Sequence, residues 1–577
     1  MEEVRVIRGQ WSGVDSETTD DGQIPDSGQI FYNRLMNGNS FTRREVLAAF
    51  LGVPAALAAC RSRNAPPLPA GEIVGASDGI GHMLRDGLSI TPPDDKWERT
   101  RVVIVGGGVA GLTAAWQLMK AGFEDFVLIE LERAPGGTAR SGSSPLVSYP
   151  WGAHYLPAPM KENRALISLL DEMGVMEGEN DEGEPVVAEQ FLCRAPEERV
   201  FFRGRWYEGL YLHAGESGDD KARIEAFNVE VRRWIGWRDG KGRRAFAIPV
   251  ATGSDDAEVT ALDKISMAEW LDRRGLTSPR LRWFVEYGCR DDYGSTLEQT
   301  SAWAGLFYFA SRVAKPGEES SPLITWPEGN GRLVSHLYSK VKSKVRLGLA
   351  VSDIIPTDPD GRKGVDCIAV DHEGRNAVGF HADRLIFAAP QFMTRYLIRP
   401  YRDYPPPHIA EFEYGAWMVA NLFLKERPLG LGFPLAWDNV LYESPSLGYV
   451  VATHQRGLDW GPTIFTYYYP LTDANPREAR AKLLEADWQD WADITLTDMT
   501  RAHSEIRTLV ERLDVMRWGH AMIRPRPGFV WSGARAAAAR PYRGIHFAHS
   551  DLSGVALFEE AFYHGIRAVE EVLSAEC

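Results

Sequence analysis

The sequence has few cysteines, no excess of basic residues and only one short uncharged apolar run near its start. Five cysteines in 577 residues are too few for a disulfide scaffold, and none has the spacing of a zinc site, so we expect no metal. The net charge of −15 argues against a nucleic-acid partner, because such proteins need a basic face. The uncharged run 46–59 has 14 residues, fewer than the roughly 20 that cross a bilayer.

The overall composition is that of a globular protein. Hydrophobic residues make up 44% of the chain, aromatic residues 11% and charged residues 25%, which excludes a wholly disordered or collagenous chain. At roughly 100–200 residues per domain, the length predicts two or three units. The 18 tryptophans fit large aromatic cores or aromatic-lined ligand sites.

The N-terminus has the pattern of an export signal. Residues 1–40 are rich in Asp, Gly, Ser and Asn and predict disorder. Arg43-Arg44 before the apolar run is typical of a twin-arginine signal, and Leu-Ala-Ala-Cys ending at Cys60 resembles a lipobox. We therefore expect a signal over 1–59, a tether over 60–100, lipidation at Cys60, and a periplasmic or membrane-anchored protein. A short buried or membrane-spanning helix is the alternative for the apolar run.

A strand, a glycine-rich turn and a helix follow the predicted tether. The apolar run 101–105 predicts a buried parallel strand, and Gly106, Gly108 and Gly111 come directly after it as Gly-x-Gly-x-x-Gly. In this motif the glycines allow a tight turn, close approach to a pyrophosphate, and close packing of helix on strand. Glu130 ends the next apolar run, where an acid binds the ribose hydroxyls. The spacing predicts a dinucleotide site.

The residues after Glu130 favour FAD. Gly136-Gly137 and Arg140 follow it, and then the segment 151–155, Trp-Gly-Ala-His-Tyr. Here the chain resembles the flavin-containing amine oxidase superfamily, which includes monoamine and polyamine oxidases, protoporphyrinogen oxidase and desaturases. The resemblance implies that the cofactor is FAD. It places Gly136, Gly137 and Arg140 near the cofactor, Val351 at the adenine, and Asp551 at the pyrophosphate or ribityl hydroxyls. A helix N-cap is the alternative role for Asp551.

The resemblance also implies the fold class, which is α/β. A Rossmann-type FAD-binding domain is expected from the discontinuous segments 101–190, 325–400 and 510–577. An α+β substrate domain with a mixed sheet is expected from the insertions 190–325 and 400–510.

Two features depart from the amine-oxidising branch. Val419 stands where that branch usually has a lysine facing flavin N5, and Lys425 falls at the end of the same strand. The C-terminal member of the family's aromatic sandwich would fall near Leu557. Desaturases and protoporphyrinogen oxidases often lack that lysine, so the resemblance leaves these branches open.

Candidate substrate residues lie in the two insertions. Asp291 and Asp292 are expected to bind a cationic amine, Tyr293 to orient it, and Trp437 to line the site. The alternative is an ion pair between Arg290 and an aspartate in a loop. His154 and Tyr155 are the candidate catalytic residues beside the flavin, by the same resemblance.

The leading functional hypothesis is FAD-dependent oxidation of an amine, with polyamines among the candidates. A hydride would pass to flavin N5, and O₂ or another acceptor would reoxidise the flavin. One alternative is a desaturase or oxidase of a hydrophobic ring or C–C substrate. Another is a flavin-binding lipoprotein that acts as a scaffold for partners without turnover. The sequence leaves the substrate, the electron acceptor and the oligomeric state open.

Overall fold

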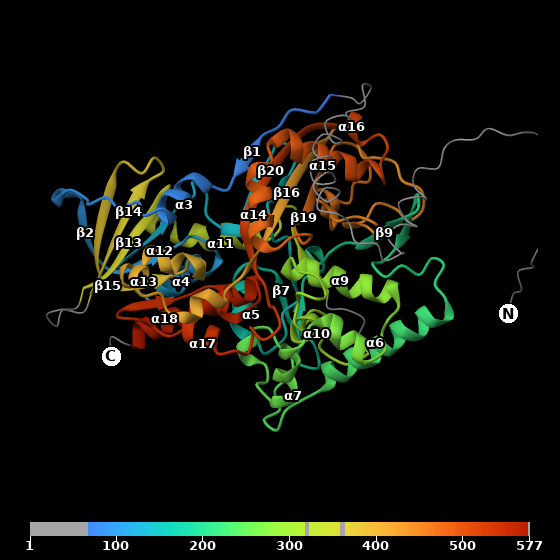
Figure 1. Cartoon of the computed structure of the whole chain (residues 1–577), viewed down its shortest axis with the longest axis horizontal. Helices are drawn as coiled ribbons and strands as arrows, with labels where there is room; N and C mark the ends of the chain where they lie inside the picture. The colour runs from blue at the N-terminus through green and yellow to red at the C-terminus, as the bar shows by residue number, and fades with distance from the viewer. Residues whose placement is uncertain (1–66, 318–321, 358–363, 575–577) are drawn as a thin grey trace, which may run out of the picture. The chain divides into compact units, whose positions relative to one another are not determined.

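Two sheets organise the part of the chain that the computed structural model describes, which is residues 67–317, 322–357 and 364–574 (Figure 1). From Leu68 onward these residues belong to a single unit. The predicted disordered region, the export signal and Cys60 lie outside the described residues. No helix in the described ranges is long and apolar enough to cross a membrane.

The first sheet is built around the strand that precedes the glycine motif. This strand, β2 (Trp97–Val105), pairs in parallel with β3 (Phe126–Glu130) and with β15 (Ala377–Phe387). Val102, Val103 and Ile104 are fully buried, as expected for a strand covered on both faces. The order is β12-β3-β2-β15-β14-β13, and β21 also pairs with β15. The remaining strands are β12 (Val345–Leu347), β13 (Leu349–Thr357), β14 (Gly364–Asp371) and β21 (Ile545–Phe547).

Helices cover both faces of the first sheet. On one face α4 (Val109–Lys120) packs against α11 (Gly331–Val341) and α18 (Phe558–Ser574), and Figure 1 shows the three helices beside the first sheet. The short helices α12 (Thr394–Leu397) and α13 (Arg399–Asp403) contact β13.

The second sheet is mixed, as the sequence predicts for the substrate domain. Its order is β1-β20-β16-β19-β18-β17-β9-β10. Most pairs are antiparallel, but β1 runs parallel to β20 and β9 runs parallel to β17. The strands are β1 (Ile73–Gly75), β9 (Glu198–Phe202), β10 (Arg205–Glu208), β16 (Tyr414–Leu424), β17 (Asp438–Leu441), β18 (Gly448–Val451), β19 (Thr463–Pro470) and β20 (Val510–Ile523).

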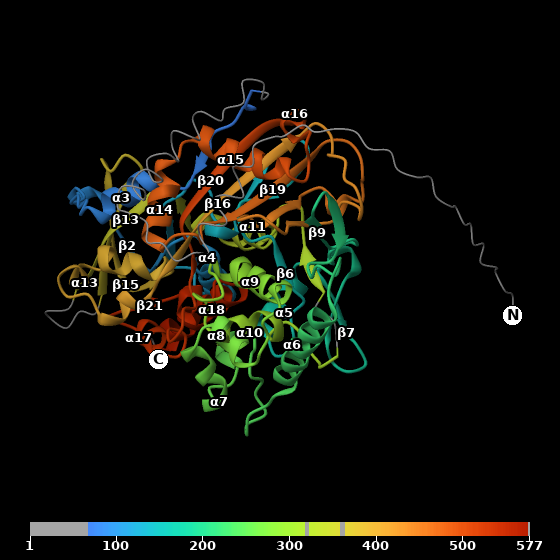
Figure 2. The same ribbon diagram turned by 45° about the vertical axis from the view of Figure 1, so that its right-hand side comes forward.

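Each face of the second sheet carries its own apolar cluster. Figure 2 shows three helices along β16, β19 and β20, and their apolar residues form one cluster with those strands. These helices are α14 (Pro476–Glu485), α15 (Trp488–Thr500) and α16 (Ile506–Leu509). The cluster on the other face includes Trp151, Val419, Trp437 and Tyr468. This inner face is the one that meets the segment 151–155.

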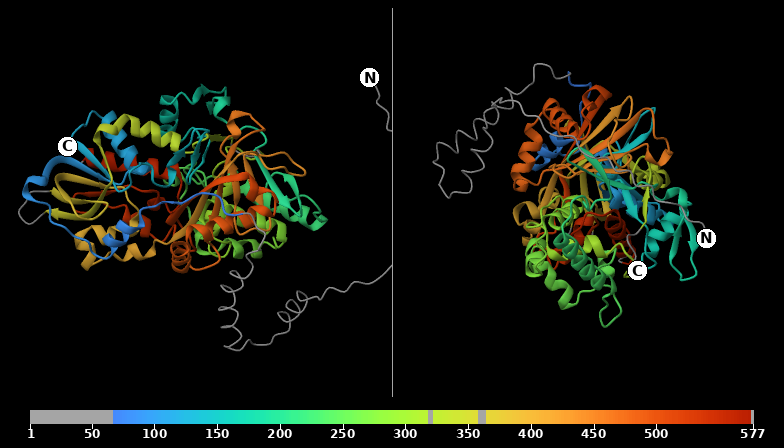
Figure 3. Two further views of the ribbon diagram at one scale, coloured as in Figure 1. Left: turned by 90° about the horizontal axis from the view of Figure 1, so that it is seen from above. Right: turned by 90° about the vertical axis from the view of Figure 1, so that its right-hand side faces the viewer.

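Helices from the first insertion form a third group. Figure 3 shows them in green in its right-hand view, below the orange strands of the second sheet. They are α6 (Gly218–Gly236), α7 (Ala257–Thr260), α8 (Met267–Arg273), α9 (Pro279–Tyr293) and α10 (Ala302–Ala310). Smaller elements complete the described fold: α3 (Asp78–Arg85), α5 (Arg164–Glu172), α17 (Ala534–Ala538), and the strand pairs β4 (Ser141–Ser143) with β5 (Ser148–Pro150), β6 (Tyr155–Pro157) with β11 (Leu323–Thr325), and β7 (Met176–Glu179) with β8 (Pro185–Val187).

Three local expectations differ from the structure. The tether predicted over 60–100 is structured in its described part, because β1 joins β20 and the amphipathic α3 buries Ile80 and Leu84. The boundary predicted at 510 assigns β20 to the FAD-binding domain, whereas β20 pairs with β16 in the second sheet. The predicted loop around Asp291 is the last turn of α9, which ends only at Gly294 in the left-handed conformation.

Candidate active site

The glycine turn has the geometry that a pyrophosphate site requires. Gly106 has a positive φ of 104°, and a side chain on Gly111 would place Cβ 1.9 Å from the Gly106 carbonyl oxygen. Gly108, in contrast, has no heavy atom within 4 Å of its added Cβ. Gly111 therefore serves close packing of α4 on β2, and Gly108 leaves open space at the N-terminus of α4.

A second glycine pair lies against this turn. The Gly136 amide donates to the Gly107 carbonyl oxygen at 2.8 Å, and Gly108 forms a β-bridge with Gly136. Gly137 follows with its backbone exposed. Gly108 caps α4 without a side-chain hydrogen bond, so the first N–H groups of the helix are left for an anion.

Glu130 closes the turn from the end of β3. Its carboxylate accepts hydrogen bonds from the Gly107 amide at 2.5 Å and the Glu132 amide at 2.7 Å. Burial raises the pKa of Glu130 to about 6, against the lowering effect of these two amides. The carboxylate lies at the place where the motif predicts a ribose contact.

Asp551 follows β21, which runs parallel to β15, and so it lies at the carboxyl edge of the first sheet. It accepts hydrogen bonds from the Tyr414 hydroxyl at 2.6 Å and the Gln391 amide at 2.9 Å. Burial acts to raise the pKa of Asp551, but His549, Tyr414 and Gln391 together hold it below its ordinary value. Asp551 is not the N-cap of α18, which begins at Phe558. Gln391 Nε2 is buried and has no hydrogen-bond partner among the described residues, so it can donate to a ligand.

Arg140 and Val351 lie at the margins of this group. Arg140 forms an ion pair with Glu132 at 3.4 Å, and its guanidinium lies 5.4 Å from the Trp518 ring centroid. Val351 is buried in β13, where its backbone faces Ala369 of β14. The open space at Gly108, the uncapped α4 and the unpartnered Gln391 amide fit a bound dinucleotide.

The segment 151–155 connects the glycine loops with the second sheet. The Ala153 amide donates to the Thr138 carbonyl oxygen at 3.1 Å, directly after the Gly136-Gly137 pair. Farther along, the His154 ring lies 5.3 Å from Trp437 and 4.9 Å from Tyr468. Burial lowers the pKa of His154 to about 4, so its imidazole is neutral at pH 7. The two candidate catalytic residues therefore lie between the dinucleotide site and the inner face of the second sheet.

Three half-buried carboxylates gather near this aromatic group, and we call Glu198, Asp291 and Asp438 the acidic cluster. Burial raises the pKa of all three. In addition, Glu198 raises the pKa of Asp291, and Glu198 and Asp291 both raise the pKa of Asp438. Tyr287 donates its hydroxyl hydrogen to Asp438 at 3.0 Å. None of the three forms an ion pair within the described residues. The raised pKa values favour the protonated forms near neutral pH, so the cluster holds three carboxyl groups that an arriving cation would help to ionise.

Asp292, next to Asp291, has a different role. Arg312 pairs with Asp292 at 2.5 Å, and both side chains are buried. Arg312 also donates to the Tyr155 hydroxyl at 3.2 Å and lies over the Tyr308 ring at 4.8 Å. The expected alternative of an Arg290 ion pair is wrong, because Arg290 donates to backbone carbonyl groups of a neighbouring loop, at Pro445 and Ser446.

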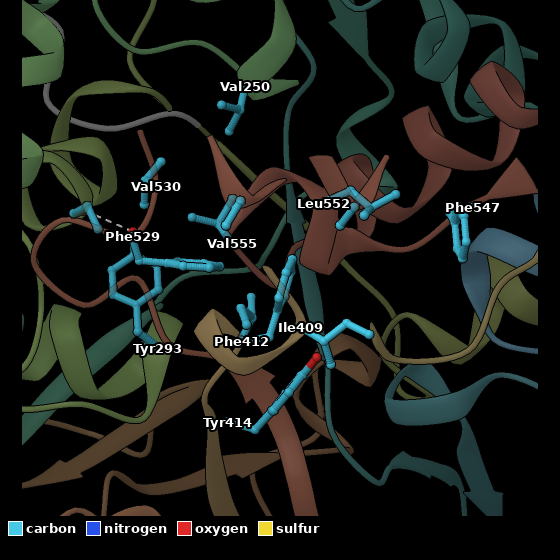
Figure 4. Close-up of a cluster of buried hydrophobic side chains, with 14 of the residues drawn as sticks. Val250, Tyr293, Ile409, Phe412, Tyr414, Phe529, Val530, Phe547, Leu552 and Val555 are labelled. Atoms are coloured by element: carbon cyan, nitrogen blue, oxygen red, sulfur yellow. Dashed lines mark hydrogen bonds between the residues drawn. The ribbon is translucent and has the colours of Figure 1, made fainter. Parts of the chain in front are cut away.

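Tyr293 lies apart from the other predicted substrate residues. It is fully buried, and its hydroxyl donates to the Ala304 carbonyl oxygen at 2.9 Å. Figure 4 shows Tyr293 among the apolar side chains of Phe529, Val530 and Val555. Its hydrogen bond is internal to the core, so the geometry gives it no free polar group for a substrate.

Four of the predicted residues and several others meet on the inner face. Trp437, His154, Tyr155 and Asp291 come together there, and Val419 packs in the same cluster as Trp437 and Tyr468. Four further residues of this region were not among the candidates predicted from the sequence: Glu198, Tyr287, Arg312 and Asp438. The only sequence feature that pointed to Asp438 is its position directly after Trp437. Glu198 has no such feature, because the pairing of β9 with β17 brings it to the site.

Comparisons with known proteins support the fold. A family model of the NAD(P)-binding Rossmann-like domain matches residues 104–173. The comparison with curated proteins finds no match.

Solved structures match nearly the whole described chain. A redesigned triple mutant of putrescine oxidase has a TM-score of 0.61 and 16% identity, covering 83% of this chain and 100% of that one. Cyclohexylamine oxidase from Brevibacterium oxydans IH-35A has a TM-score of 0.54 and 14% identity, over 82% and 98% of the two chains. The fatty acid isomerase of P. acnes that produces CLA has a TM-score of 0.57 and 15% identity, over 82% and 98%. At such identities the likeness establishes the α/β fold predicted from the sequence.

Proposed function

We propose that this protein is an FAD-dependent oxidoreductase that oxidises an amine, with diamines and polyamines as the first candidates. The acidic cluster carries the proposal, because three carboxyl groups without an ion pair among the described residues lie beside aromatic rings, and a bound cation would favour their ionised forms. FAD supplies hydride chemistry when bound. Gly108, the uncapped end of α4, Glu130, Gln391 and Asp551 are the groups of this chain that would hold it.

The chain's own residues have separate tasks in this proposal. The acidic cluster binds and orients the ammonium group, and Trp437 and Tyr468 exclude water around it. An amine must lose its proton before it gives up a hydride. His154 lies between the two sites and is neutral at pH 7, but its lowered pKa of about 4 makes it a weak acceptor for that proton; Glu198 and Asp291, whose pKa burial raises to about 7, are the better acceptors. Tyr155, linked to Arg312, fixes the neighbouring wall.

A desaturase or oxidase of an apolar substrate is the second candidate, and Val419 in place of a lysine favours it. A long apolar substrate, however, would leave the acidic cluster without any counter-charge. Structural relatives at this distance include both amine oxidases and a fatty acid isomerase, so they do not separate the two.

Anaerobic mixing of the FAD-loaded protein with monoamines, diamines, polyamines and amino acids tests the proposal. We expect an amine to bleach the visible flavin band, and Asp438→Asn to require a higher concentration of that amine. Glu208→Gln, an exposed carboxylate at the end of β10, is the matched control and should behave as the parent. If no amine bleaches the flavin, while an apolar unsaturated substrate does, the second candidate is correct.

A further inference from the structure

Helix α9 contacts the β17–β18 hairpin along one stripe of its surface. We call residues 442–447, which join the two strands, the hairpin loop. Trp283 stacks on a tyrosine of this loop with 4.3 Å between the ring centroids, and Tyr287, one turn later, donates its hydroxyl hydrogen to Asp438 of β17. Arg290, after a further turn, contacts the hairpin loop again. Residues at i, i+4 and i+7 share one face of a helix, so the three contacts together fix α9 against the hairpin.

Arg290 makes the polar contact between this stripe and the hairpin loop. Its guanidinium donates to the carbonyl oxygens of Pro445 and Ser446, the latter at 3.1 Å. The side chain is buried, and it forms no ion pair with any residue that the structure describes. A buried cation is costly unless hydrogen-bond acceptors surround it. Movement of the loop away from α9 would therefore leave a buried cation without these partners.

A second buried charge holds the same loop. Asp498 of α15 accepts hydrogen bonds from Ser444 Oγ at 2.7 Å and from Ser446 Oγ at 2.8 Å, and it pairs with the exposed Arg501 at 3.5 Å. Ser446 thus meets Arg290 through its carbonyl oxygen and Asp498 through its hydroxyl group. We call Arg290, Ser446 and Asp498 the loop clamp, because they hold the hairpin loop between a cation of α9 and a carboxylate of α15.

The two segments that the loop clamp joins each carry a member of the acidic cluster. Asp291 follows Arg290 directly on α9, and Asp438 begins β17, the strand that leads into the hairpin loop. Neighbouring residues of an α-helix point about 100° apart, so the hold on Arg290 fixes the rotation of α9 and with it the direction of Asp291. The separation of the Asp291 and Asp438 carboxyl groups therefore depends on where Arg290 holds the hairpin.

We propose that Arg290 is a positioning residue of the amine site. Through the loop clamp it sets the spacing of Asp291 from Asp438, and that spacing determines how tightly the two carboxyl groups hold an ammonium group. The inference rests on the proposed function, since it assumes that an amine binds at the acidic cluster. Arg290 itself does not touch the substrate in this proposal, because its guanidinium is bound to the hairpin loop.

The sign of the effect separates position from charge. The positive charge of Arg290 repels a bound ammonium group, so its removal would tighten amine binding if charge were its only influence. Loss of the loop clamp acts in the opposite direction, because it releases α9 and the hairpin from their fixed separation. A small displacement of a binding group weakens its hold on a ligand steeply. We therefore expect weaker amine binding when Arg290 is replaced by an uncharged residue of similar length.

Anaerobic flavin reduction in the FAD-loaded full chain tests this inference by a double-mutant cycle. We expect Arg290→Met to raise the concentration of amine needed for half-maximal reduction about tenfold. The same substitution should have little effect in an Asp438→Asn background, because the spacing that Arg290 sets no longer matters there. The matched control is Arg280→Met, at the start of the same helix, where the arginine donates to the Leu212 carbonyl oxygen of a different loop. This control should bind the amine as the parent does.

Hydrogen exchange, measured by mass spectrometry without any amine, separates this inference from the proposed function. Arg290→Met should speed the exchange of the hairpin-loop amides about tenfold, and Arg280→Met should leave it unchanged. If no amine reduces the flavin of the parent, the proposed function fails, whereas hydrogen exchange still shows whether Arg290 holds the loop.

Three results would each overturn the inference: unchanged exchange of the hairpin loop in Arg290→Met, unchanged or tighter amine binding by that variant, or an equally large effect in the Asp438→Asn background. Ser446→Ala replaces Arg290→Met if that variant does not fold. It breaks the loop clamp on the side of Asp498 and should show the same dependence on Asp438.

Discussion

Replacing Glu198 by glutamine should stabilise this protein and weaken its binding of amines at the same time. Glu198 begins β9, and its carboxylate has no hydrogen-bond or ion-pair partner among the described residues. Burial, reinforced by Glu197, raises the pKa of Glu198 to about 7. Glutamine keeps the shape of the side chain and removes the charge that the fold accommodates poorly.

The size and sign of the stability change follow from proton linkage. The folded protein holds the proton of Glu198 more tightly than the unfolded chain, whose glutamates titrate near 4.5. Below about pH 4.5 the carboxyl group is protonated in both states and does not lower the free energy of unfolding. Between pH 4.5 and pH 7 its ionisation lowers the free energy of unfolding progressively, and the full loss is reached above pH 7. The full difference corresponds to about 3 kcal/mol. Because Glu198 is only half-buried, we expect about 1–2 kcal/mol of it to be recovered.

Denaturant unfolding of the FAD-loaded protein at pH 4.5 and pH 8 measures this effect. Glu198→Gln should exceed the parent in free energy of unfolding at pH 8 and equal it at pH 4.5. Glu208→Gln, on the neighbouring strand and exposed, should equal the parent at both. In parallel, the concentration of amine needed for half-maximal flavin reduction should rise about tenfold in Glu198→Gln, because one of three carboxylates is lost.

Two results would refute this reasoning. A loss of stability at pH 8 in a folded Glu198→Gln variant would mean that the carboxylate has a stabilising partner. A gain of stability with unchanged amine affinity would mean that the charge is buried, as argued, but does not meet the substrate.

Three further changes probe the rest of the site. Glu130→Ala removes the acceptor at the end of β3, so flavin retained through purification should fall at least tenfold by absorbance; full occupancy would contradict the dinucleotide site. Asp292→Asn leaves the Arg312 guanidinium buried without its anion and should lower the free energy of unfolding by about 3 kcal/mol in thermal melts. Asp272→Asn, at an exposed ion pair, should change it by less than about 1 kcal/mol. Finally, KM for the amine should fall as pH rises from 6 to 8 and Glu198 ionises; a flat profile would exclude the carboxylate from binding.

The first sheet was accessible from the sequence because its signals are local. A β-branched strand, three spaced glycines and an acid at the end of the next strand occupy residues 101–130 and leave one reasonable arrangement. The return of the chain through β15 and β21 required the resemblance to a family, since neither strand carries a motif of its own. Likewise, β20 looks from the sequence like the entry to the last FAD-binding segment, but its long pairing with β16 keeps it in the second sheet.

The acidic cluster was only partly accessible, because long-range pairing assembles it. Asp291 and Trp437 were identified from charge and aromatic content in the insertions. Their neighbour Glu198 comes from a strand some 240 residues before Asp438, and parallel pairing of β9 with β17 places the two at the same register position. No local pattern predicts such a pairing. Tyr293 shows the opposite error, since a tyrosine next to two aspartates turned out to fill the core.

The contrast between neighbouring aspartates is the strongest physical argument for a cationic ligand. Arg312 forms an ion pair with Asp292, whereas Asp291, Asp438 and Glu198 form none with any residue that the structure describes. Buried charges without partners are costly, and substitution by neutral side chains of the same size would remove that cost. A protein whose only need was stability would gain from each of these substitutions. The cluster therefore supports the proposal of a cationic substrate, and the pH dependence of amine binding is the measurement that tests it.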